Sequence, residues 1–86
     1  MADGVTSDRF FGVLASILNV ERESLHPQSS RDTLEEWDSV KHMYVMLALE
    51  EEFSVEFTDD EIANLASVSD LMRAMTAKTG ATLSWQ

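Results

Sequence analysis

Leu34-Glu-Glu-Trp-Asp-Ser-Val40 is the stretch at which a polar, turn-prone segment gives way to the most apolar helical run of the chain. Ser39 stands at the start of that run, where unpaired backbone N–H groups and the helix dipole favour an attached anion. A simpler interpretation is that Ser and Asp are common at helix starts because their side chains cap the helix. Asp38-Ser39 on its own favours the cap.

The helix expected over residues 39–53 carries two apolar stripes when its residues are placed at about 100° per step. The first stripe is typical of a core and comprises Val45, Met46, Leu49 and Phe53, with His42 on the same arc. The second comprises Val40, Met43, Tyr44 and Leu47. A helix in so small a domain seldom needs two apolar faces. The second stripe is therefore either more core or an exposed surface for partner proteins, and we favour the partner surface.

A first helix is expected from Ser7, a suitable N-cap, to Asn19 or Val20. Its apolar residues recur with helical spacing and comprise Phe10, Phe11, Val13, Leu14, Ile17 and Leu18. A long polar loop over residues 21–37 follows, in which Pro27 disfavours helix at the residue before it. The residues expected to anchor this loop to the core are Leu25, Leu34 and Trp37.

Two more helices are expected after residue 54. Thr58-Asp-Asp-Glu61 has the capping-box pattern and opens a short helix that carries Ile62 and Leu65. The last helix starts within residues 67–70 and ends at Gly80, and its buried side comprises Val68, Leu71, Met72 and Met75. No segment alternates with strand periodicity. The sequence thus predicts an all-α fold, a small four-helix bundle of three main helices and one short helix, with the long loop between the first two.

Length and composition bound the function. The 86 residues fit one domain, 1–86, in which we expect 1–6 to be a flexible leader and 81–86, with Trp85, a flexible tail. The absence of cysteine means that any thiol must arrive on an added group. A net charge of -10 argues against nucleic acid or an anionic membrane surface as a partner. With neither a signal-peptide pattern nor a run long enough to span a membrane, we expect a cytoplasmic protein without membrane insertion.

Several side chains could suggest catalysis or metal binding. Asp38, Ser39 and His42 are the ingredients of a hydrolase, since three residues along a helix bring His42 near Ser39. No Gly-x-Ser-x-Gly elbow accompanies them, however. His26 and His42 are too few for a metal site, and Asp59-Asp-Glu61 lacks the ligand spacing of a calcium loop. We expect a protein without catalytic activity and without a metal.

Trp37-Asp-Ser-Val40 followed by Met46-Leu-Ala-Leu-Glu-Glu-Glu-Phe53 resembles the acyl carrier proteins of fatty-acid and polyketide synthesis. The similarity continues through Val55-Glu-Phe-Thr-Asp-Asp-Glu-Ile62 to Ser67-Val68 and covers nearly the whole chain. The resemblance implies that Ser39 receives 4′-phosphopantetheine from coenzyme A through a phosphopantetheinyl transferase. The residues that flank this site are Trp37, Asp38 and Val40. The terminal thiol of the group would carry acyl chains as thioesters, and the chain would act as a monomer.

The resemblance also implies roles for the helix after Ser39. The expected lining of an internal acyl cavity comprises His42, Val45, Met46, Leu49, Phe53 and Ile62. The residues expected to recognise acyl-loading and acyl-processing enzymes with basic docking surfaces are Lys41, Met43, Tyr44, Leu47, Glu50, Glu51 and Glu56. Lys41 and Tyr44 stand where many carriers of primary fatty-acid synthesis have acids. Since charge complementarity selects partners, these departures point to a specialised pathway.

Three alternatives stay open at this point. An aminoacyl or peptidyl carrier of the non-ribosomal type would use the same arm for another cargo. An acidic helical adaptor would have no prosthetic group, and Ser39 would only cap a helix. A small hydrolase using Ser39 and His42 comes last.

Overall fold

α2 (Ser39–Phe53) is the central helix of the computed structural model, which describes residues 7–81 and 83. It begins after Asp38, whose backbone is extended, and its bounds are those expected from the sequence. It ends because Ser54 adopts a left-handed conformation with φ of 57°. The N–H of Val55 then donates to the carbonyl of Glu50 at 3.2 Å, a bond that closes the last turn.

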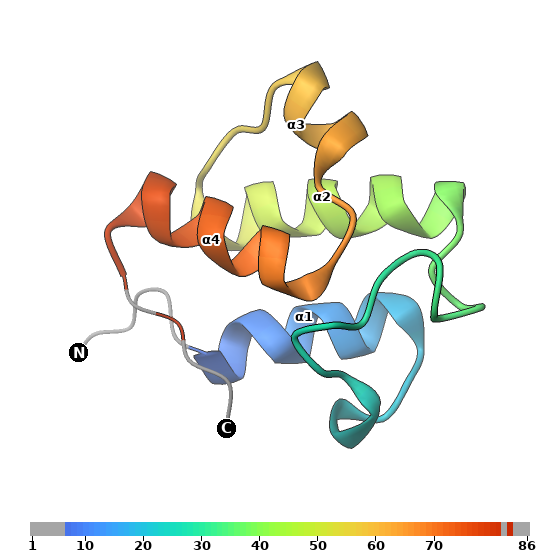
Figure 1. Cartoon of the computed structure of the whole chain (residues 1–86). Helices are drawn as coiled ribbons and strands as arrows, with labels where there is room; N and C mark the ends of the chain where they lie inside the picture. Colours follow the sequence, from blue (N-terminus) through green and yellow to red (C-terminus); the bar gives the residue numbers. More distant parts are fainter. Residues whose placement is uncertain (1–6, 82, 84–86) are drawn as a thin grey trace.

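α1 (Ser7–Leu18) runs antiparallel to α2 and packs against it (Figure 1). It ends at Leu18, one or two residues earlier than the sequence predicted. The physical reason is Asn19, which adopts a left-handed φ of 60°. The N–H of Val20 therefore reaches back to the carbonyl of Ala15 at 3.1 Å, which satisfies an end carbonyl of the helix.

The long loop after α1 is fastened to the start of α4 (Val68–Thr79). It contains one 3-10 turn, η1 (Arg22–Ser24), which the sequence-based prediction missed. Three backbone hydrogen bonds make the attachment: Val68 N–H to Ser29 O at 2.9 Å, Ser69 N–H to Pro27 O at 3.0 Å, and Arg31 N–H to Ala66 O at 3.1 Å. The three predicted anchors are confirmed, because Leu25 and Trp37 are buried and Leu34 is half-buried.

α3 (Asp59–Asn64) is the short helix, and both bonds of its predicted capping box are present. The hydroxyl of Thr58 accepts from the Glu61 N–H at 3.1 Å, and the Glu61 carboxylate accepts from the Thr58 N–H at 2.8 Å. Leu65, which the sequence placed on this helix, lies just after it as its C-cap. Figure 1 shows α3 on the side of α2 opposite to α1.

α4 begins after Ser67, whose hydroxyl accepts from the Asp70 N–H at 3.1 Å. It ends at Gly80, where a φ of 77° favours glycine. The described residues thus form an all-α fold with three main helices, one short helix and a long first loop, as predicted. Leu83 is buried, so at this position the chain packs on the core where a flexible tail was expected. Trp85 and residues 1–6 lie outside the described residues.

The core lies where α1, α2 and α4 meet. Its fully buried large residues from the helices are Phe10, Phe11, Leu14, Leu18, Val45, Met46, Leu49, Val68, Leu71 and Met75. Burial of one such side chain contributes about 1.5–3 kcal/mol relative to its exposure. Met72, expected on the buried side of α4, is only half-buried, and Phe57, in the connection after α2, joins the core. Among the described residues, no helix is long and apolar enough to cross a bilayer.

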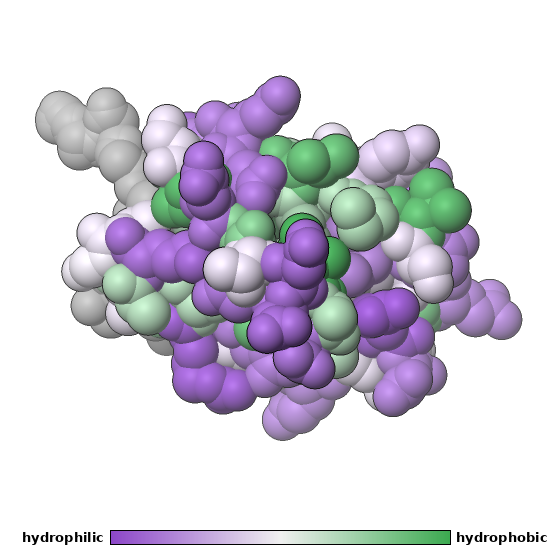
Figure 2. All heavy atoms as spheres, turned by 90° about the horizontal axis from the view of Figure 1, so that it is seen from above, coloured by the Kyte–Doolittle hydropathy of each residue, from purple (hydrophilic) through white to green (hydrophobic). Residues whose placement is uncertain are grey.

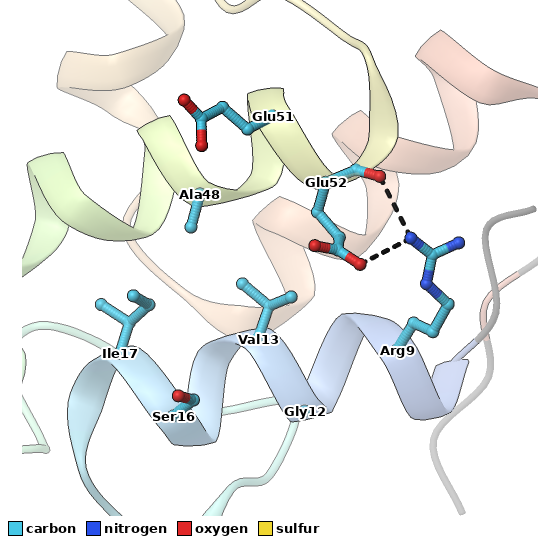
Figure 3. A pocket seen from close by; sticks show the side chains of 8 residues that line it. All are labelled: Arg9, Gly12, Val13, Ser16, Ile17, Ala48, Glu51 and Glu52. Carbon is cyan, nitrogen blue, oxygen red and sulfur yellow. Dashed lines mark hydrogen bonds and ion pairs between the residues drawn. The ribbon is translucent and has the colours of Figure 1, made fainter.

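A shallow groove follows the contact between α1 and α2. Val13 and Ile17 point from α1 towards Ala48 on α2 (Figure 3). One end of the groove is bridged by Arg9, whose guanidinium donates to the carboxylate of Glu52 at 2.6 Å and to its carbonyl at 3.2 Å. The groove is thus closed by an ion pair at the C-terminal end of α2.

Candidate functional site

Ser39 is the first residue of α2 and is exposed. Asp38 precedes it as the N-cap, and its carboxylate accepts from the Lys41 N–H at 2.9 Å. The Asp38 carbonyl also accepts the first helical bond, from the His42 N–H at 2.8 Å. The Ser39 hydroxyl makes no hydrogen bond to any of the described residues. Asp38 therefore caps α2, and the interpretation that Ser39 serves only as the cap is wrong.

A hollow of about 320 Å³ opens beside Ser39. Two adjacent segments, the long loop and the start of α2, line it together with the residues before α4, which are distant in sequence. The lining residues are Arg31, Asp32, Trp37, Asp38, Ser39 and Ala66. The sequence analysis missed Arg31, Asp32 and Ala66, because no local spacing relates them to Ser39. The backbone hydrogen bonds between the loop and the start of α4, among them that of Arg31 with Ala66, bring them together.

Two buried rings support the site from beneath. The indole Nε1–H of Trp37 donates to Nδ1 of His42 at 3.0 Å, and the two ring centroids are 6.0 Å apart. Nδ1 is thereby an acceptor, which leaves the proton on Nε2 to donate to the carbonyl of Ile62 at 2.7 Å. His42 thus joins the loop before Ser39 to α2 and α3. Trp37 and His42 expose only 1% and 3% of their surface.

The same arrangement favours the neutral form of His42. Burial lowers the pKa of His42 below its ordinary value of 6.5, the hydrogen bond to Ile62 opposes this, and the charge of Arg31 adds to the lowering. Both ring nitrogens are already engaged. His42 is therefore not placed to act as a general base for Ser39. The hydrolase interpretation needs such a base, so the structure argues against it. Within the described residues, no cluster of three His, Asp or Glu side chains could hold a metal ion.

An apolar stripe runs along the outer face of α2 from Ser39. Val40, Met43, Tyr44 and Leu47 expose 59%, 45%, 53% and 52% of their surface. The prediction that this stripe lies outside the core is confirmed. Figure 2 shows the face above α2 and α3 as largely hydrophilic, with hydrophobic residues in separate groups. Lys41 lies beside the stripe, half-buried.

The three acids expected to recognise partners have different surroundings. The carboxylate of Glu50 accepts from the half-buried N–H of Phe57 at 2.9 Å, so it holds the connection after α2. Glu51 and Glu56 are exposed. Glu50 is thus part of the fold, whereas Glu51 and Glu56 are available at the surface.

The residues expected to line an acyl cavity lie together on the inner side of α2. His42 and the apolar residues Val45, Met46, Leu49 and Phe53 are buried, and Ile62 of α3 is half-buried against them. Their side chains pack against the other helices in one core. An acyl chain would enter only by separating them.

Comparison with known proteins places the chain in a family. A family model described as "Phosphopantetheine attachment site" matches residues 8–75. The acyl carrier protein of Thermosynechococcus vestitus is 33% identical over 69 residues, which cover 80% of this chain and 85% of that protein. The acyl carrier protein of a Picosynechococcus species is 27% identical over 74 residues, 86% of this chain and 91% of that protein.

The family model spans the long loop, α2, α3 and most of α4, and so includes every residue of the site described above. Members carry 4′-phosphopantetheine, are modified by a phosphopantetheinyl transferase, and interact with the enzymes of a pathway without being catalysts. The chain belongs to this phosphopantetheine-bearing carrier family and is distantly related to the acyl carrier proteins.

Proposed function

We propose that Ser39 is the attachment residue and that the chain carries acyl groups as thioesters between the enzymes of a fatty-acid, polyketide or specialised lipid pathway. The observation that carries the proposal is the exposed Ser39 hydroxyl, which has no hydrogen bond to the described residues because Asp38 caps the helix. The attached group supplies the thiol, which a chain without cysteine lacks. The helix N-terminus favours the negative charge of a phosphodiester there.

The outer face of α2 is the proposed docking surface for partner enzymes. Its exposed apolar residues are Val40, Met43, Tyr44 and Leu47, and it starts at the attachment residue. Desolvation of such side chains in an interface supplies affinity. Glu51 and Glu56 would face basic groups on the partner enzyme and steer its approach. Lys41 would instead disfavour a partner that has a basic group opposite it.

The inner face of α2 is the proposed shelter for an acyl chain. Shelter would require the core side chains to move apart, because they pack against the neighbouring helices. His42 is buried on the same face, so its hydrogen bonds to Trp37 and Ile62 would have to adjust. Methyl NMR of Val45 and Leu49 tests this: loading of a long acyl chain should shift both resonances, and unchanged resonances would refute the shelter.

One experiment tests the attachment. The apo protein is incubated with coenzyme A, magnesium and a promiscuous phosphopantetheinyl transferase, and intact mass is measured beside a Ser39→Ala control. The wild type should gain the mass of one arm and the control should gain none. An unmodified wild type, with a competent carrier modified in parallel, would refute the carrier function. An arm on Ser39→Ala would place the attachment elsewhere.

The choice of an acyl over an aminoacyl cargo is supported by the relatives, both of which are named acyl carrier proteins. Intact mass of the holo protein after incubation with acyl-transferring or amino-acid-adenylating enzymes separates the two. Loading of an amino acid alone would replace the acyl proposal by the aminoacyl or peptidyl one.

A further inference from the structure

The lysine and arginine side chains differ in whether they form ion pairs. Of the six Lys and Arg residues, four pair with acids: Arg9 with Glu52, Arg22 with Asp8, Arg73 with Asp70 and Lys78 with Glu61. Arg31 and Lys41 form no ion pair with any of the described residues. Since acids outnumber bases sixteen to six, a base without a partner is unexpected.

One of these cations, Arg31, lies beside Ser39 in the fold, and the other, Lys41, follows it closely in the sequence. Arg31 lines the hollow that Ser39 also lines, and its backbone is fixed by the hydrogen bond to Ala66 at 3.1 Å. Lys41 is two residues after Ser39 in the first turn of α2, with its N–H bound to the Asp38 carboxylate. One cation therefore comes from the loop and the other from the helix.

Two acids share this region without pairing with either cation. Asp32 and Asp38 also line the hollow. The Asp38 carboxylate is occupied by a backbone N–H, and Asp32 is exposed. Two cations and two carboxylates therefore stand around Ser39, and the exposed Glu35 and Glu36 precede them in the loop. The two cations without an ion pair would oppose the repulsion that an anion on Ser39 meets from these acids.

We propose that Arg31 and Lys41 are positioning residues that pair with the phosphodiester on Ser39. The inference rests on the proposed attachment at Ser39. An arginine supplies several charge-assisted N–H donors in a fixed plane, and a lysine supplies a compact charge. Together with the helix N-terminus, they hold the base of the arm at the hollow. Attachment then stabilises the fold, although it adds a negative charge to an acidic chain.

The test compares apo and holo forms of the wild type with Arg31→Gln, Lys41→Gln and Arg73→Gln. Arg73 is the matched control, because it is on α4, already paired with Asp70, and its loss changes the net charge equally. At low salt, the melting temperature of the wild type should rise on attachment. That rise should shrink by about 2–5 °C in Arg31→Gln and in Lys41→Gln and stay unchanged in Arg73→Gln. High salt should reduce the differences between variants.

Phosphorus NMR of the holo forms gives a second readout. The phosphodiester resonance should move in Arg31→Gln, return towards the wild-type position in Arg31→Lys, and coincide with the wild type in Arg73→Gln. If all variants are modified but share one holo-minus-apo difference and one phosphorus shift, the anion pairing is refuted and the attachment stands. If intact mass shows no arm on the wild type, both proposals are refuted.

Discussion

The two ends of α2 are built in opposite ways. At the C-terminal end, acidic side chains of α2 are bound within the fold, since Glu50 accepts from the Phe57 N–H and Glu52 pairs with Arg9. At the N-terminal end, neither the Ser39 hydroxyl nor the Lys41 ammonium is bound by the described residues. The guanidinium of Arg9 also lies 5.0 Å from the ring centre of Phe53, which adds to the closure of the C-terminal end.

The difference shows how a small domain keeps a site both rigid and accessible. The N-terminal end is supported by Trp37 and His42, which are buried, while Ser39 is exposed to solvent. Rigid support fixes the backbone that presents Ser39. The exposed Ser39 is available to a prosthetic group or a partner.

The largest effect is expected from removing the support. Trp37→Ala should lower the free energy of unfolding by about 3–5 kcal/mol, because it empties a fully buried site. Trp37→Phe keeps most of the volume but leaves Nδ1 of His42 without its donor, and should cost about 1–3 kcal/mol. Urea unfolding measures both. Losses below about 1 kcal/mol in Trp37→Ala would mean that the N-terminal end does not depend on this support.

The pH dependence tests the same support through His42. Because burial holds the pKa of His42 below 6.5, the unfolded chain binds the proton more readily than the folded one. The contribution of neutral His42 to the free energy of unfolding should therefore be complete above pH 6.5. It should decrease as the pH drops below 6.5, by no more than about 1.4 kcal/mol per pH unit. Urea unfolding at about pH 7.5 and about pH 5.5 measures the change, and His42→Gln should show a smaller one. An identical change in the free energy of unfolding between these pH values in the wild type and in His42→Gln would refute a protonation effect at His42.

The roles of the two neighbours at the start of α2 should separate cleanly. Asp38→Ala removes the cap and should cost about 1 kcal/mol of stability. Ser39→Ala should change the stability of the apo protein by less than about 0.5 kcal/mol, because its hydroxyl bonds no described residue. Thermal unfolding of the two apo variants provides the comparison. A larger loss of stability in Ser39→Ala than in Asp38→Ala would mean that Ser39 caps the helix.

Two acids at the C-terminal end of α2 should differ by a similarly small amount. Glu50→Ala leaves the half-buried Phe57 N–H without its acceptor and should cost about 1 kcal/mol. Glu51→Ala should leave stability within about 0.5 kcal/mol, since it removes an exposed acid near the end of the helix where the dipole disfavours it. Glu51→Lys should instead slow association with a basic partner enzyme, measured by stopped flow. Equal stability losses at Glu50 and Glu51 would remove the distinction between them.

Much of the fold follows from interactions that are local in the sequence. The bounds of α2, the capping box of Thr58 and Glu61, and the end of α4 at Gly80 depend on residues within one helical turn. The division of α2 into an inner and an outer stripe follows from a period of about 3.6 residues. Even the error at the end of α1 is local, because it depends on one left-handed residue, Asn19.

The sequence by itself therefore determined the order of the four α-helices, the capping box of α3, the glycine end of α4, the two faces of α2 and the family to which the chain belongs. Only the tertiary structure decided what surrounds Ser39. The partners of His42 come from the loop and from α3, and Arg31 reaches the hollow because the loop is fastened to the residues before α4. The physical reason is that the path of a long loop depends on hydrogen bonds between segments more than thirty residues apart, for which no local periodicity exists.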